Sequence, residues 1–94
     1  MALFEYKTTA DTMNMLGASL KHKTGVSFLA VDGYGYARMV TFVSGVLTIE
    51  DKYDSYEYTV EFVETSSGKF LAIANDEEII LSISKTDGLR ESEE

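Results

Sequence analysis

The chain has 94 residues, with 16 acidic side chains against 8 basic ones and no cysteine. This length suits one domain with a thin core, and the lack of cysteine excludes disulfides, thiolate metal sites and cysteine catalysis. The charge is uneven: residues 1–49 have three acids and four bases, whereas residues 50–94 have thirteen acids and four bases. Such an excess of acid disfavours generic binding to nucleic acid or anionic membranes, because both depend on Lys and Arg.

A helix is predicted near the start, after residues 3–7, which suit a short first strand or an ordered arm. Thr8 and Asp11 have the spacing of a capping box, with Thr8 as the N-cap. Apolar residues then recur at helical spacing: Ala10, Met13, Leu16, Gly17 and Leu20. Three cations that suit the negative end of the helix dipole follow: Lys21, His22 and Lys23. With Gly25 as the stop signal, the pattern predicts a helix over residues 9–22.

The chain after Gly25 is typical of β-structure, because short apolar or alternating runs are separated by turn signals. The predicted strands are 26–31, 34–43, 46–50, 56–63, 69–74 and 78–84. Asp32-Gly33 and Ser44-Gly45 are expected to be two-residue hairpin turns. In the last strand, alternation predicts that Ile79, Leu81 and Ile83 face inward and that Ile80 faces outward.

These elements predict an α+β fold with one N-terminal helix packed on a five- to six-stranded antiparallel meander. A partly closed small barrel of the SH3 or Sm type is the main variant. We expect a single domain over residues 1–85 and a flexible acidic tail over residues 86–94. No apolar run approaches the ~20 residues that span a bilayer, and the start lacks a secretory signal, so a cytoplasmic protein without membrane contact is expected.

The sequence gives little support for a catalytic site or a metal site. His22 is the only histidine, and no nucleophile or carboxylate can be assigned to it, so we expect a surface residue. Carboxylates cluster over residues 50–54 and 76–78, but without the regular spacing or the glycine of a calcium loop. We therefore expect a protein that is not an enzyme and has no metal site and no cofactor.

One short motif resembles a known family. Gly33-Tyr34-Gly35-Tyr36-Ala37 is similar to the central strand of RNA-recognition-motif domains, in which aromatic residues two apart stack on bases. The resemblance implies one strand face that presents Tyr34, Tyr36 and Arg38 to RNA. Asp32 and Met39 depart from the family's pattern, and residues 45–64 alternate like strands where that family has its second helix.

The acidic half offers another candidate surface, because residues 50–64 contain six acids and one base. Glu57 and Glu61 are expected on the solvent face of one strand, where same-face residues repeat at roughly 6.8 Å, comparable to successive phosphates. The candidate partner-binding residues are Glu50, Asp51, Asp54, Glu57, Glu61 and Glu64. An excess of acid also serves as a solubility device in small β proteins.

These observations predict a small acidic binding protein, an inhibitor or modulator that docks on a basic, nucleic-acid-binding surface of another protein. In size and charge it is similar to phage-encoded inhibitors of host defences. The alternative is a small RNA-binding or Sm-like module that uses Tyr34, Tyr36 and Arg38. A homo-oligomer remains open.

Overall fold

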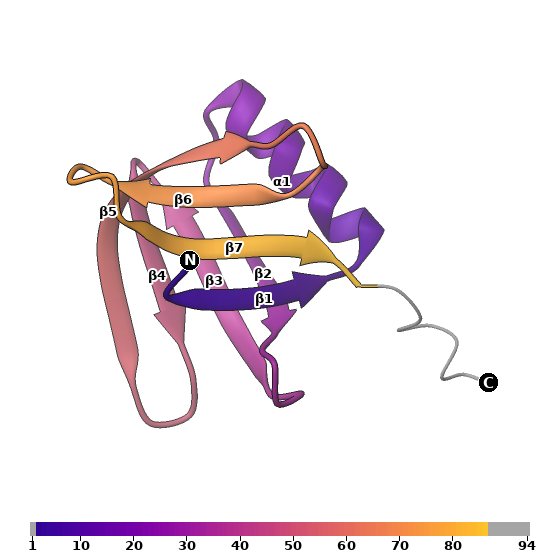
Figure 1. The fold of residues 1–94 in the computed structure, drawn as a ribbon, viewed down its shortest axis with the longest axis vertical. Helices are drawn as coiled ribbons and strands as arrows, with labels where there is room; N and C mark the ends of the chain where they lie inside the picture. The colour runs from indigo at the N-terminus through magenta and orange to yellow at the C-terminus, as the bar shows by residue number, and fades with distance from the viewer. Residues whose placement is uncertain (1, 87–94) are drawn as a thin grey trace.

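The computed structural model describes residues 2–86, which form one helix and a closed seven-stranded barrel (Figure 1). The elements in chain order are β1 (Phe4–Thr8), α1 (Ala10–His22), β2 (Val26–Val31), β3 (Ala37–Val43), β4 (Val46–Glu50), β5 (Ser55–Glu64), β6 (Phe70–Ala74) and β7 (Ile79–Lys85). Neighbouring strands from β1 to β7 pair antiparallel, and β1 closes the barrel by pairing parallel with β7.

The prediction of one helix with a mostly antiparallel sheet is confirmed in outline, but the strand count of five to six is wrong. The described residues contain seven strands because residues 4–8 form a full strand, with Tyr6 and Thr8 buried. This strand joins the two ends of the sheet, so the barrel closes. The N–H of Thr86 donates to the carbonyl of Thr8 at 2.8 Å. Of the predicted acidic tail, residues 87–94 lie outside the described residues.

The helix ends at the predicted residue, starts one residue later than predicted and has different caps. Thr9 is the N-cap, and its side-chain oxygen accepts a hydrogen bond from the N–H of Thr12 at 3.2 Å. Thr8, the predicted cap, belongs to β1, where its hydroxyl donates to the carbonyl of Leu29 at 2.8 Å. The helix ends at His22, and its C-cap is Lys23, which takes the left-handed conformation with φ 59°, two residues before the predicted stop at Gly25.

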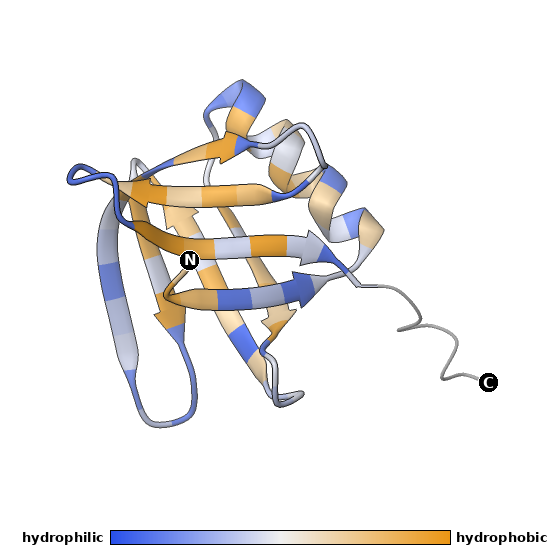
Figure 2. Cartoon of the chain, viewed as in Figure 1, coloured by the Kyte–Doolittle hydropathy of each residue, from blue (hydrophilic) through white to orange (hydrophobic). Residues whose placement is uncertain are grey.

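The helix covers one end of the barrel (Figure 1). Met13 and Leu16 are buried from its apolar stripe, and Leu20 shares a small cavity with Phe42 of β3. We call this end the helix end. The opposite end carries the loops over residues 32–36 and 51–54, and we call it the loop end. Figure 2 shows hydrophobic residues gathered on the strands and hydrophilic residues in the β4–β5 loop and the β6–β7 turn. No helix within residues 2–86 is long and apolar enough to cross a membrane.

The inward face of β7 differs from the predicted alternation. Ala72 of β6 pairs with Leu81, yet Ile73 pairs with Ile79, so Ile80 is the extra residue of a β-bulge. The bulge turns Ile80 into the core with 1% of its surface exposed, whereas Ile79 is only half-buried. The prediction of an outward Ile80 is therefore wrong. The inward positions of Leu81 and Ile83 are confirmed, since both are fully buried.

Candidate functional site

The strand β5 presents two glutamates on its outer face. Alternation along β5 turns Val60 into the core, while Glu57, Thr59 and Glu61 are exposed. The predicted solvent exposure of both glutamates is therefore confirmed. Across the sheet, Glu57 lies opposite Thr48 of β4, and Glu61 lies opposite Ile73 of β6. The two glutamates are four positions apart, which corresponds to about 13 Å along β5.

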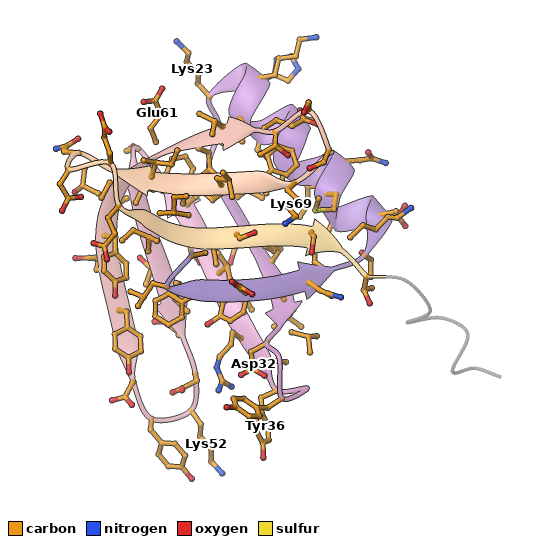
Figure 3. All side chains as sticks on the ribbon, in the orientation of Figure 1. Lys23, Asp32, Tyr36, Lys52, Glu61 and Lys69 are labelled. Carbon is orange, nitrogen blue, oxygen red and sulfur yellow. The ribbon has the colours of Figure 1, made fainter. Side chains whose placement is uncertain are left out.

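The six predicted acids do not form one continuous surface. Glu50 ends β4 and is exposed, and Asp54 is exposed in the β4–β5 loop. Glu64 lies at the far end of β5, opposite the buried Phe70, so it follows the inward rather than the outward alternation. Figure 3 shows Glu61 at the helix end, whereas Asp32, Tyr36 and Lys52 lie together at the loop end.

Asp51 has a separate, structural environment at the loop end. Its Oδ1 accepts hydrogen bonds from the N–H groups of Tyr53 and Asp54, both at 2.7 Å, and so closes the β4–β5 loop. Its Oδ2 lies 3.9 Å from Nε of Arg38. The N–H groups of Asp54 and Tyr53, helped by Arg38, hold the pKa of Asp51 below its usual value.

Asp32 closes the neighbouring β2–β3 loop in the same way. Its Oδ1 accepts from the N–H groups of Tyr34 at 2.8 Å and Tyr36 at 3.0 Å, and its Oδ2 pairs with Nη2 of Arg38 at 3.0 Å. Desolvation alone would raise the pKa of Asp32, but the N–H groups of Tyr36 and Tyr34 and the Arg38 charge together lower it. Arg38 therefore joins two hairpin loops that are far apart in the sequence.

The two tyrosines of the predicted aromatic face lie in this loop. Strand β3 begins at Ala37, so the prediction of one strand over residues 34–43 is wrong at its start. The connection is a five-residue loop rather than a two-residue turn, because Asp32 binds the backbone of residues 34 and 36 and Gly35 has φ 92°. Tyr34 is 89% exposed and Tyr36 is 63% exposed. Arg38 alone belongs to the strand, and its guanidinium lies 5.6 Å from the centre of the Tyr36 ring.

An open cavity of about 440 Å³ lies at the loop end. Its lining includes Tyr6 and Tyr56, together with Arg38, Asp32 and Asp51. Burial raises the pKa of the Tyr6 phenol, against the opposing effect of the Arg38 charge. This cavity therefore combines aromatic rings with charges of both signs, whereas the outer face of β5 exposes the acids Glu57 and Glu61.

The sequence did not reveal the link between Asp32, Arg38 and Asp51. A partial signal was present, because each aspartate directly follows an apolar strand and precedes residues typical of a turn. The position of Arg38 between them depends on strand pairing, which no local pattern records.

His22, the only histidine, lies exposed at the end of α1. Within residues 2–86, no group of three His or acidic side chains is arranged to hold a metal ion. No protein-family model, no curated protein and no solved structure matches this chain.

Proposed function

We propose that the protein is a small non-enzymatic binding protein that docks on a basic surface of another protein. The acidic outer face of β5, with Glu57 and Glu61, is the proposed contact. In this proposal the protein inhibits or modulates its partner by covering a surface that otherwise binds nucleic acid.

One observation carries the proposal: the acids of β5 lack compensating charge. Among residues 2–86, the ion pairs are those of Arg38 with Asp32 and Asp51, so Glu57 and Glu61 form none with these residues. Like charges on one surface oppose the compact state, and a basic partner relieves this repulsion. Glu50 and Asp54 extend the same field toward the loop end.

The test compares two charge-reversed variants of the full chain. Glu57→Lys with Glu61→Lys should lose the partner and keep the fold, because both side chains point into solvent. The matched control is Glu77→Lys with Glu78→Lys, which changes the net charge equally in the exposed β6–β7 turn. The measurement is affinity capture with each variant, mass spectrometry, and competition by duplex DNA and by RNA.

The proposal requires that the parent and the control capture a protein that the β5 variant does not capture. Nucleic acid should displace that protein from the parent. Equal capture by the β5 variant would contradict it. The alternative RNA-binding function has support in the exposure of Tyr34 and Tyr36 beside Arg38. Single-stranded RNA binding that is lost in Tyr34→Ala with Tyr36→Ala would favour that function.

A further inference from the structure

The barrel is joined weakly between β1 and β2. Only one pair of residues, Lys7 and Val31, connects these strands, whereas every other pair of neighbouring strands is connected by four to six. The seam stays short because the chain leaves β2 at Asp32, whose N–H donates to the carbonyl of Tyr36 within the loop at 3.0 Å. The first half of β1 therefore has no strand beside it on this edge among the described residues.

The hydrogen bonds identify which backbone groups face this gap. The N–H of Asp32 donates within its own loop, and the carbonyl of Thr8 accepts from Thr86, so neither group bonds between β1 and β2. The hydrogen bonds between these two strands therefore join Lys7 directly to Val31. Groups of alternate residues point to the same edge of a strand, so the N–H and C=O of Glu5 share the edge of Lys7. The next residue across would be Gly33, which has left β2, so β2 offers these two groups of Glu5 no partner.

The open stretch is centred on Glu5. Before it, the N–H of Leu3 turns back to the carbonyl of Ile79 at 3.1 Å, toward β7. After it, Lys7 is paired with Val31. A single hydrogen-bonding position of the barrel edge is therefore free, between two positions that are already satisfied.

A cavity lies on each side of this open edge. The inner one is the loop-end cavity of about 440 Å³, and the outer one, of about 590 Å³, lies over the outward side chains of β1, β6 and β7. Five residues line both cavities: Ala2, Glu5, Tyr6, Asp32 and Gly33. An extended segment placed beside β1 would direct alternate side chains into the two cavities, which is the geometry of peptide binding by strand addition.

We propose that the gap beside β1 binds an extended peptide by strand addition, antiparallel to β1, with a basic side chain in the inner cavity. The inner cavity offers the rings of Tyr34 and Tyr56 to a cation. Acids also outnumber bases in its lining: Glu5, Asp32 and Asp51 against Arg38. This site is separate from the outer face of β5, and its test does not need the partner proposed above.

The probe is the blocked peptide acetyl-Thr-Lys-Val-Lys-Val-Lys-Thr-amide, followed by NMR of the full-length protein. With its lysines directed inward, its valines lie opposite Glu5 and exchange hydrogen bonds with it. We expect shifts of the amide signals of Glu5, Tyr6 and Gly33. The same peptide with Glu in place of Lys should bind at least about tenfold more weakly, because it reverses the favourable charge.

Backbone methylation separates strand addition from simple attraction. Methyl groups on the two valine backbone nitrogens should abolish binding, whereas methyl groups on the lysine backbone nitrogens should not, because those nitrogens point away from β1. In the protein, Glu5→Pro should abolish binding and keep the fold, since the N–H of Glu5 lies on the edge where β2 offers it no partner. Glu5→Gln, which keeps the N–H, should still bind.

Three results would overturn the inference: no shift at β1 with the lysine peptide, equal binding after valine methylation, or full binding by Glu5→Pro. If Glu5→Pro unfolds the protein, the methylated peptides with the parent chain still decide the question. Shifts confined to Glu57 and Glu61 would overturn this inference and leave the proposed function standing.

Discussion

A single residue, Arg38, links the two loops of the loop end. It lies on β3 at an inward position, and its charge reaches one aspartate in each neighbouring loop. Both carboxylates are also bound by backbone N–H groups of their own loops. Arg38 is therefore engaged within the protein, so we assign it the task of positioning the loops that carry Tyr34, Tyr36 and Tyr53.

This arrangement predicts a pH dependence. The pKa values of Asp32 and Asp51 are lowered in the folded protein, so both stabilise it above the unfolded value of about 3.9. That contribution is lost as the pH falls through the lowered pKa values. Arg38→Met should raise both pKa values and make the acid-induced loss of stability shallower. NMR titration of the carboxyl groups and melting between about pH 5 and pH 2 measure both effects.

Lys52→Met is the matched control for Arg38→Met. Lys52→Met removes one positive charge from the β4–β5 loop, which also contains Asp51, but Lys52 pairs with neither aspartate within the described residues. Its acid titration should follow that of the parent. An Arg38→Met protein with the parent's two pKa values would show that the backbone N–H groups alone account for the shifts.

The last strand shows how the pairing of elements overrides a local pattern. The bulge at Ile80 places the side chains of two consecutive residues, Ile80 and Leu81, in the core. Regular alternation would place them on opposite faces of the strand. Next to the bulge, the carbonyl of Ile79 accepts a hydrogen bond from the N–H of Leu3, just before β1.

Ile80→Asp and Leu81→Asp should each unfold the protein. Each change buries an unpaired carboxylate, at a cost of more than about 4 kcal/mol, which is a large part of a small domain's stability. Ser84→Asp is the control, because Ser84 faces outward in the cavity shared with Lys7 and Lys69. Thermal melting by circular dichroism decides the matter. A stable Ile80→Asp protein would mean that β7 follows the regular alternation and that the bulge is absent.

The whole molecule carries a formal net charge of −8, and most of its acidic residues lie in the second half of the sequence. Mutual repulsion of this charge opposes folding, and salt screens it. Raising the ionic strength from about 0.01 M to about 0.15 M shortens the screening length from roughly 30 Å to 8 Å, so the melting temperature should rise.

The charge-reversed variant Glu57→Lys with Glu61→Lys halves the net charge and should show a smaller rise. A melting temperature that falls with salt would show that attractive ion pairs, such as those of Arg38, outweigh the repulsion. The same comparison measures how much stability the acidic face costs the free protein, which bears directly on its proposed use as a contact surface.

The sequence by itself determined the features that depend on neighbouring residues. The helix over Ala10–His22, the strand Val26–Val31 and the exposure of Glu57 and Glu61 followed from periodicity, because each element buries one face. The Ser44-Gly45 turn followed from the glycine, which adopts positive φ at low cost; φ is 52° at Ser44 and 82° at Gly45.

Only the tertiary structure decided the closure of the barrel, the bulge at Ile80 and the link from Arg38 to Asp32 and Asp51. Each depends on contacts between residues distant in the chain, such as the parallel pairing of Tyr6 with Ile83. Burial of a shared core selects these contacts, and residues adjacent in sequence carry no record of them. The free edge at Glu5 has the same origin, because it exists only where β2 turns away from β1.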